Sequence, residues 1–304
     1  MTAASLVVQL VGGFVLAPLL PGLIQHWKAR LQGRRGPSPV QPYRELRRLW
    51  GKSTVAVDYS SIVYRLAPAV AAASLATAVL LVPVAASAPS LGVGRDVLAL
   101  LGLLALARFV VAAACWDVAN GFSLMGASRD LTISVSVEAT FVLAVAAAVL
   151  AAGTTNLAGM IAGTAGGGVW SGPALGLAAV AFALVAVAET GRQPVDNPDT
   201  HLELTMIHEG PLLEYAGRDL ALLQWAAAAR HWLVLVIAAQ VFVPHSHAVW
   251  LQLAVLPVVL AGLCAALALV ETLVVKMRIL LVPRLLLVGA AAALLGVVSW
   301  LVQL

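Results

Sequence analysis

Long apolar stretches alternate with short polar segments along the whole chain. Most of the apolar stretches reach about 18 residues or more, which as a helix is enough to cross roughly 30 Å of hydrocarbon in a bilayer. The alternating segments of about ten residues that mark a transmembrane β-barrel are not visible. The pattern predicts an all-α polytopic membrane protein with about eight transmembrane helices. The expected spans are residues 4–24, 62–86, 96–116, 132–152, 173–189, 226–243, 249–270 and 285–303.

The first span is expected to be retained as a membrane helix. No basic residue precedes it and its charges follow it, whereas a signal peptide carries its positive charges in front of the apolar region. We therefore expect residues 1–304 to form a single integral membrane domain. A basic loop at 25–61 and an acidic loop at 190–225 interrupt it.

A shorter helix of a different kind is expected just after the first span. Beyond Pro42, the apolar residues Tyr43, Leu46, Leu49 and Trp50 fall on one helical face, and charged residues occupy the rest. This spacing predicts a short amphipathic helix that lies on the membrane surface or against a partner. A basic loop that only sets the topology, with a lipid-facing helix, is the alternative.

Composition and charge add an orientation to this picture. The chain is 62% hydrophobic with a mean hydropathy of +0.98, whereas a soluble domain is about 45–50% apolar. Of the 18 Lys and Arg residues, all but Arg95 and Arg108 fall in or beside the alternate segments 25–65, 116–131, 189–230 and 271–284. The positive-inside rule places these segments in the cytoplasm and both termini outside. Because the net charge of +4 comes from this asymmetry, it does not indicate a nucleic-acid partner.

No motif for a cofactor or a metal is present in the sequence. Cys115 and Cys264 both lie in apolar stretches, and two thiols are too few for an iron–sulfur cluster, which needs about four ligands. The chain has no P-loop, no GxGxxG at the start of a helix, no HExxH and no GxSxG. We expect no cofactor and no metal site in this chain.

Two charged residues lie within predicted spans at matching depths. Arg108 is eight residues before the cytoplasmic end of its span near Trp116, and Glu138 is eight residues after Asp130, where the chain re-enters the membrane; eight residues is about 12 Å along a helix. Asp130 and Ser134 share one helical face with Glu138, and Glu189 ends the fifth span. A charge near mid-bilayer costs roughly 2.5–3.5 kcal/mol, so such groups pair or line a water path. A static ion pair between Arg108 and Glu138 and a proton relay are both open.

The acidic loop carries the densest charge in the chain. Its centre, RQPVDNPDTHLELTMIHEGPLLEYAGRD (192–219), is far longer than the roughly 2–8 residues that join two helices. Crowded carboxylates in a partly dry site can rise in pKa toward neutrality and then exchange protons. Three interpretations stay open: a solvated loop, a proton-handling or docking element, and a carboxylate–histidine metal site. No spacing of residues in the loop is diagnostic of a metal site.

Four blocks of the sequence resemble one family. They are ARLQGRRGPSPVQPYRELRRL (29–49), GASRDLTISVSVEA (126–139), RQPVDNPDTHLELTMIHEGPLLEYAGRDLALLQWA (192–226) and ETLVVKMRILLVPRLL (271–286). They are similar to the membrane subunit shared by respiratory complex I and the membrane-bound group 4 [NiFe]-hydrogenases. The blocks follow the order of the family and span nearly the whole chain.

The third block separates two branches of that family. The complex I form is similar to R-x-P-F-D-x-x-E-x-E-x-E-L followed by a Glu-Tyr pair, and this chain departs from it with Val195, Asp199 and His201. The segment THLELTMIHE instead resembles the corresponding segment in the formate hydrogenlyase subunit 4 branch. Because acidic residues that flank a quinone tunnel are partly replaced, the block argues against a tunnel of the complex I type. The positions that agree are Arg192, Pro194, Asp196, Glu203, Glu214 and Tyr215.

The resemblance implies a non-catalytic subunit of a multisubunit oxidoreductase in the bacterial inner membrane. Its implied partners are hydrogenase large and small subunits and an iron–sulfur subunit, which would carry [NiFe] and [4Fe–4S], together with antiporter-like membrane subunits that move H⁺ or Na⁺. For the proton path the resemblance implies Glu138 and the loop residues Asp196, Asp199, Glu203, Glu209 and Glu214, and the residue pattern adds Arg108, Asp130, Glu189, His201 and His208. The implied docking residues are Arg34, Arg35, Tyr43, Arg47, Arg48, Arg192, Tyr215, Lys276 and Arg278.

Two other functions stay open on the sequence. One is the complex I subunit itself, with a quinone site between the first helix, the amphipathic helix and the acidic loop. The other is a secondary transporter that works alone. Against the transporter, the two halves of the chain lack corresponding helices broken by Gly or Pro.

Overall fold

A helical bundle makes up the regular structure of the chain. The computed structural model describes residues 2–55, 57–84, 95–166, 168–197 and 207–303, and within these ranges all regular structure is helical apart from one isolated bridge between Asp96 and Asn156. The predicted all-α fold class is confirmed. The α-helices are α1 (Thr2–Leu10), α2 (Leu19–Leu31), α3 (Gln41–Trp50), α4 (Ile62–Leu81), α5 (Val97–Val118), α6 (Gly121–Ala152), α7 (Leu157–Thr164), α8 (Pro173–Glu189), α9 (Gly217–Val241), α10 (Val249–Leu273) and α11 (Val282–Gln303). Shorter turns are η1 (Val11–Leu16), η2 (Gly168–Trp170), η3 (Gly210–Leu212) and η4 (Ile279–Leu281).

Six helices in the described part of the chain are long and apolar enough to cross a membrane. The N-terminal helices form a seventh candidate, because Leu6–Leu16 and Leu19–Leu31 are two apolar segments bent by 58° at the break between them. The apolar helix α8 is shorter, with 17 residues. These elements agree with the predicted count of about eight.

Two helices begin well before the predicted spans. α6 starts at Gly121 and not near residue 132, because Ala119 takes a left-handed turn (φ 55°) and the Asn120 side chain caps the new helix by accepting from Phe122 N at 2.9 Å. With 32 residues α6 is about 48 Å long, which exceeds a bilayer core. The predicted polar connection 116–131 is therefore mostly helix, since hydropathy does not detect a helix that continues into a polar surrounding. α9 likewise starts at Gly217.

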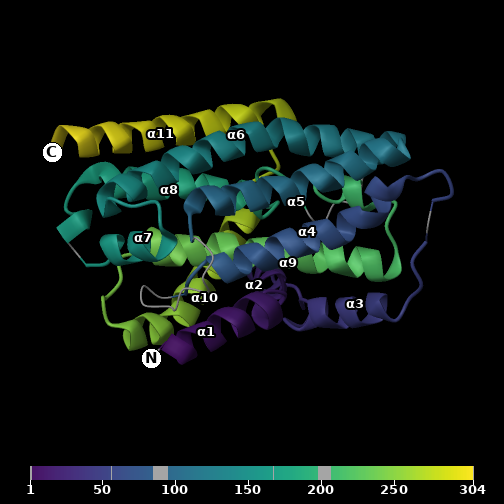
Figure 1. The fold of residues 1–304 in the computed structure, drawn as a ribbon, viewed down its shortest axis with the longest axis horizontal. Coiled ribbons are helices and arrows are strands. Elements are labelled where there is room, and N and C mark those ends of the chain that lie inside the picture. Colours follow the sequence, from purple (N-terminus) through teal and green to yellow (C-terminus); the bar gives the residue numbers. More distant parts are fainter. Residues whose placement is uncertain (1, 56, 85–94, 167, 198–206, 304) are drawn as a thin grey trace.

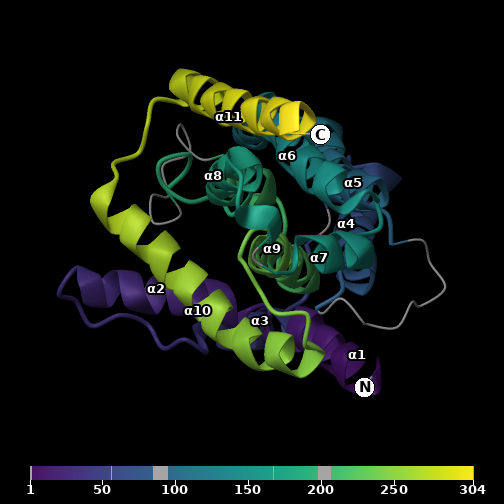
Figure 2. The same cartoon turned by 90° about the vertical axis from the view of Figure 1, so that its left-hand side faces the viewer.

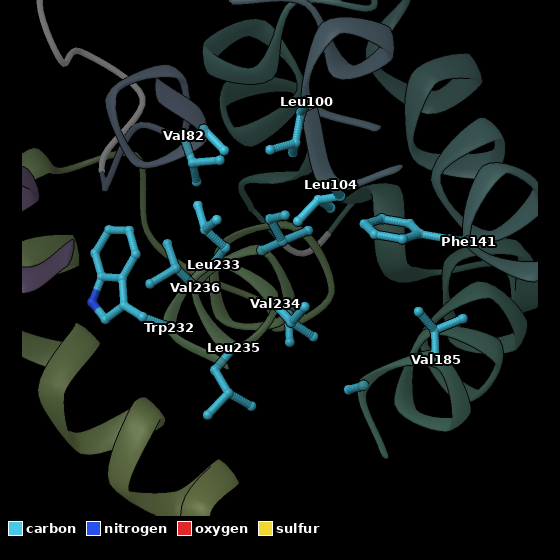
Figure 3. Packing of buried hydrophobic residues seen from close by; sticks show 14 of the residues in the cluster. Val82, Leu100, Leu104, Phe141, Val185, Trp232, Leu233, Val234, Leu235 and Val236 are labelled. Atoms are coloured by element: carbon cyan, nitrogen blue, oxygen red, sulfur yellow. The ribbon is translucent and has the colours of Figure 1, made fainter. Parts of the chain in front are cut away.

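α9 forms the centre of the bundle. Every residue from His231 to Val241 is buried, so this half of α9 has no face toward the surroundings. Figure 3 shows Trp232, Leu233 and Leu235 leaving α9 in different directions, among side chains from the neighbouring helices. A helix that is apolar all round is stable only inside such a core.

The other helices surround α9 along the long axis of the molecule (Figure 1). The N-terminal and C-terminal helices end at the same side of the molecule (Figures 1 and 2). Helices distant in sequence lie side by side, because α10 packs against α2, and α11 packs against α6 and α8 (Figure 2).

The predicted amphipathic helix is present as α3. It packs against α9 and α2, with Leu49 buried and Tyr43 and Leu46 half-buried. Trp50, predicted on the same face, is 56% exposed. The Tyr43 hydroxyl donates to the carbonyl of Val15 at 2.6 Å, which fixes α3 beside the bent N-terminal helices.

Candidate functional site

The acidic loop begins with a tight turn directly after α8. Gly191 has a φ of +61°, which favours glycine, and a Cβ at this position would lie 3.0 Å from the His208 ring. The Gln193–Pro194 peptide bond is cis, and the amides of Val195 and Asp196 donate to the carbonyl of Arg192 at 2.9 and 3.1 Å. This geometry turns the chain back and brings Asp196 next to His208.

Asp196 holds the two described ends of the acidic loop together. Its Oδ2 accepts hydrogen bonds from Ile207 N (3.3 Å) and His208 N (3.2 Å) and lies 3.2 Å from His208 Nδ1. Its Oδ1 accepts from Lys276 Nζ at 2.9 Å. Burial raises the pKa of the Asp196 carboxyl, but the hydrogen bonds and charges of His208 and Lys276 outweigh it and hold this pKa well below its usual value. Asp196 is therefore a carboxylate at neutral pH.

His208 links this loop to the helices within the bundle. Its Nε2 lies 3.7 Å from Asp130 Oδ1 on α6, while its Nδ1 faces Asp196. Asp130 Oδ2 is in turn 3.4 Å from Arg108 Nε on α5. A histidine between two carboxylates can accept a proton at one nitrogen and release it at the other.

Arg108 is the centre of the buried charges. Its guanidinium lies 2.9 Å from Glu189 Oε1 and 3.3 Å from Glu138 Oε1, besides the contact with Asp130. Arg230 Nη1 on α9 approaches the second oxygen of Glu189 at 3.5 Å. The side chains of Arg108 and Glu189 are buried, whereas the Glu138 side chain is 43% exposed. Arg108 and its carboxylate partners thus extend from the buried core to a partly exposed side of α6.

These contacts form one continuous series, which we call the charged chain. Each member lies within 4 Å of at least one other, and the series branches at Arg108; the members come from α5, α6, α8, α9, the acidic loop and the α10–α11 connection. The members are Lys276, Asp196, His208, Asp130, Arg108, Glu138, Glu189 and Arg230. Membrane charges that pair in this way occur in proton relays and also in static networks.

A second ionic cluster lies outside the charged chain, and we call it the triad. Glu271 near the end of α10 meets Arg192 Nη1 at 3.1 Å with one oxygen and Lys28 Nζ on α2 at 3.4 Å with the other. The side chain of Glu271 is fully buried, and those of Arg192 and Lys28 are only 4% and 6% exposed.

A close helix–loop crossing sets the position of His208. A Cβ on Gly126 of α6 would lie 2.8 Å from the Cα of Gly210, and one on Gly210 would lie 2.9 Å from the Cα of Gly126. Two glycines therefore let η3 rest directly on α6. Cys115 Sγ on α5 contributes a weak hydrogen bond to the carbonyl of Pro211 at 3.6 Å.

The far end of the acidic loop is anchored to α4 and α6. The rings of Tyr64 and Tyr215 stack with centroids 4.5 Å apart, and each hydroxyl bonds to a main-chain carbonyl of the other segment. Asn120 Nδ2 donates to Glu214 Oε1 at 2.6 Å. Burial, helped by nearby Tyr64, raises the pKa of the Tyr215 hydroxyl, which keeps it a donor.

The charged chain lines one wall of a cavity of about 840 Å³. Pro21, Gln25 and Glu45 of α2 and α3 also line it, together with apolar residues of α4 and α5. His231 on α9 also lines it; its Nδ1 lies 3.2 Å from the carbonyl of Ala227, and its Nε2 has no hydrogen-bond partner among the described residues. A space of this size, partly apolar and partly charged, suits a small molecule or ordered water.

The predicted site residues fall into distinct places. Of the implied proton path, Glu209 lines the cavity, Glu214 anchors the loop, and Asp199, His201 and Glu203 lie outside the described residues. Of the implied docking residues, Arg192 and Tyr215 are buried within the chain, and Tyr43 and Lys276 are half-buried. The exposed docking residues are Arg34, Arg35, Arg47, Arg48 and Arg278.

The sequence interpretation missed three charged partners: Lys28, Arg230 and Glu271. Arg230 and Glu271 lie at the edges of apolar stretches. Because charges near a membrane span need partners, this position could have marked both as members of buried ion pairs. Lys28 was counted only as one of many topogenic charges. No group of three or more His, Cys, Asp or Glu with metal-binding geometry occurs among the residues that the structure describes.

Comparisons with known proteins give consistent similarities. A family model described as NADH dehydrogenase matches residues 3–301. The chain is 33% identical to formate hydrogenlyase subunit 4 of Escherichia coli over 298 residues, which is 95% of each protein. It is 32% identical to hydrogenase-4 component C of the same organism over 300 residues, or 95% of this chain and 93% of that protein.

More distant similarities extend to other complexes. NADH-quinone oxidoreductase subunit 8 of Rhodothermus marinus is 28% identical over 207 residues, which is 65% of this chain and 58% of that protein. Among solved structures, a chain of the membrane-bound sulfane sulfur reductase, an archaeal respiratory membrane complex, superposes with a TM-score of 0.82 at 19% identity. The match covers 97% of this chain and 99% of the other, and it shows a shared fold.

Proposed function

This chain belongs to the NADH dehydrogenase family of membrane subunits, and from that premise we propose that it couples a peripheral redox arm to ion movement across the membrane. In this proposal the redox arm is a [NiFe]-hydrogenase with iron–sulfur subunits, and antiporter-like subunits lie beside this chain in the membrane. The chain itself transfers no electrons. Its similarity over nearly full length to formate hydrogenlyase subunit 4 and hydrogenase-4 component C supports this choice of partners.

The charged chain is the observation that carries the proposal. It begins at the half-buried Lys276 and the buried Asp196, continues through His208 and Asp130 to Arg108, and ends at the partly exposed Glu138 on the side of α6. A proton can pass between the carboxylates and the histidine through small rotations or bridging water, while the guanidinium of Arg108 stays protonated and holds Asp130 and Glu138 beside the path. The exposed Glu138 is where an adjacent membrane subunit would take over.

The docking role rests on the basic surface at the loop end of the molecule. Arg34 and Arg35 precede α3, Arg47 and Arg48 lie on it, and all four are exposed. Guanidinium groups suit paired contacts with carboxylates of a peripheral subunit. The same charges orient this end toward the cytoplasm in a bacterial inner membrane, with both termini outside.

The test uses the assembled complex reconstituted in lipid vesicles. Redox turnover with an artificial electron donor and the resulting pH gradient are measured for Glu138→Gln and Asp130→Asn, with the exposed Asp58→Asn as a matched control. We expect the two variants to keep turnover and assembly but to lose most of the gradient, because an amide cannot carry a proton. Full coupled activity in both variants would refute the relay. Repeating the assay with a sodium ionophore separates H⁺ from Na⁺ as the transported ion.

The cavity favours a second function, quinone binding. Its volume of about 840 Å³ is within the usual size of a ligand site, and its walls include α2, α3 and the acidic loop. A quinone could place its polar head near the charged wall and its tail along the apolar sides. Quinone retained by the purified complex, together with inhibition that quinone overcomes, would support this function; absence of both would leave the hydrogenase-type role.

A further inference from the structure

The end of α10 and the base of the acidic loop lie side by side and bond repeatedly. Glu271 pairs with Arg192 at 3.1 Å, and Met277 N donates to the carbonyl of Pro194 at 2.9 Å. Lys276 Nζ then reaches Asp196 at 2.9 Å. Residues 192–196 are thus held along their length by residues 271–277, and we call this set of contacts the clamp.

One more contact completes the clamp between these outer bonds. In the amide orientation that its surroundings require, the Gln193 nitrogen donates to the carbonyls of Glu271 (3.1 Å) and Val274 (2.6 Å). Val274 follows directly after α10, so its carbonyl is free of the helix ladder and can accept. Each residue from Arg192 to Asp196 except Val195 therefore has a bond to the 271–277 segment.

The clamp has a sealed charged end and a half-open charged end. At the sealed end, Glu271 is fully buried between Arg192 and Lys28 of α2. At the other end, Asp196 belongs to the charged chain through His208. A buried carboxylate between two cations stays in one place, because moving it leaves uncompensated charge in a dry environment. The triad is therefore suited to fix a position and not to pass a proton.

The triad also reaches the cavity. Arg192 itself lines the cavity, and Lys28 lies about one turn beyond Gln25 of α2, which is another lining residue. α2 packs against α10, which crosses it in Figure 2. One rigid connection therefore runs from a cavity wall through Lys28, Glu271 and Arg192 to Asp196.

We propose that Glu271 is a positioning residue that, through the clamp, holds Asp196 and His208 in line with Asp130. This inference rests on the proposed function of the charged chain. In it, the end of α10 determines whether His208 and Asp130 of the charged chain stay in contact. Glu271 itself carries no proton in this role. Loosening the clamp opens the contact between His208 and Asp130, which at 3.7 Å is the longest link of the series.

The first experiment measures coupling in the reconstituted complex with Glu271→Gln. This change keeps the size of the side chain and removes the charge that pairs with Arg192 and Lys28. We expect the gradient formed per redox turnover to fall about tenfold, in the range by which residues outside a site alter coupling. The matched control is Thr272→Val, since the Thr272 hydroxyl bonds only to carbonyls of its own helix among the described residues.

The second experiment asks whether position is what Glu271 supplies. In the Glu271→Gln protein, with Cys115 and Cys264 replaced by Ala, cysteines at Gln193 and Val274 are joined by a short bifunctional thiol reagent. If the clamp acts by position, cross-linking restores coupling to at least half of the native value, and a cleavable reagent reverses this on reduction. Coupling that stays low after complete cross-linking overturns the proposal.

The two proposals fail in different ways. If Glu138→Gln and Asp130→Asn abolish the gradient while Glu271→Gln leaves it unchanged, the clamp is refuted and the charged chain stands. If none of the three variants alters the gradient, the charged chain itself is refuted. Assembly is verified by recovery of the complete complex in every variant, so a loss of folding is not counted as a loss of coupling.

Discussion

The charged chain and the triad contain the same kinds of residue but differ in nearly every physical respect. The charged chain is extended and branched, its exposure ranges from buried Glu189 to the partly exposed Glu138, and it includes a histidine. The triad is compact and contains no histidine, and its three side chains are at most 6% exposed. Ion transfer needs groups that can change charge and reach water, whereas fixing a position needs groups that cannot.

The contrast also explains why each cluster tolerates burial. Isolated charges in a membrane are costly, so both clusters are nearly balanced in formal charge. In the charged chain three cations face four carboxylates, with His208 between two of them. His208 is the one histidine of the set, and it lies where the two halves of the series meet.

The largest expected effect comes from removing the centre of the charged chain. Arg108→Met leaves Asp130, Glu138 and Glu189 without their shared cation, and we expect a loss of about 4 kcal/mol in the free energy of unfolding. Recovery of intact complex and thermal unfolding in detergent measure this loss. Adding Glu189→Gln should restore part of it, and a single variant as stable as the native chain would contradict the role of Arg108.

A smaller effect is expected from the triad, and it depends on how the triad is changed. Glu271→Leu alone leaves Lys28 and Arg192 buried without a counter-charge and should cost about 3 kcal/mol. Replacing all three residues by Met or Leu should return the stability to within about 1 kcal/mol of native, since apolar packing replaces buried ion pairs well. Denaturant titration compares the two. Equal losses would show that the triad contributes net ionic stability.

The next effect distinguishes the clusters by pH. The pKa of Asp196 is lowered in the folded state, so its contribution is present above its unfolded pKa of about 4 and is lost as the pH falls through the folded value. Asp196→Asn should therefore cost about 2 kcal/mol at pH 7, the difference shrinking below about pH 4. Unfolding at several pH values measures this. A difference that grows toward acid pH would have the wrong sign.

The smallest effect concerns the glycine crossing that supports the charged chain. Gly126→Ala places a Cβ 2.8 Å from Gly210 and should push η3, and His208 with it, away from α6 at a cost of about 1 kcal/mol. Gly102→Ala on α5 is the matched control, because a Cβ there meets nothing within 4 Å and alanine favours a helix. Coupling should fall only in the Gly126 variant. Equal coupling in both variants would show that the crossing of Gly126 and Gly210 does not support the charged chain.

Part of the site was predictable because it depends on depth in the membrane. Arg108 is eight residues from Trp116 and Glu138 is eight residues from Asp130, so helical rise alone placed the two at one level, and the structure brings them within 3.3 Å. The crowding of charge in 192–219 likewise marked the loop that contributes Asp196 and His208. Both inferences used only local spacing and composition.

Other parts of the site depend on which helices become neighbours. Glu189 is 81 residues from Arg108, and Glu271 is 79 from Arg192, so no local pattern relates them. The extension of α6 to Gly121 also escaped prediction, although it is what places Asp130 on a helix beside His208. Hydropathy detects apolar segments, and it does not detect the part of a helix that extends out of the membrane because that part is polar.

The sequence by itself determined that this protein is a helical membrane subunit, which segments carry positive charge, and which family it belongs to. These properties follow from composition, hydrophobic periodicity and sequence motifs, each of which can be recognised in one segment of the chain at a time. Only the tertiary structure decided that the buried charges divide into a charged chain and a separate triad. That division depends on contacts of a few ångströms between side chains of six or more segments, and such contacts exist only once the helices have packed around α9.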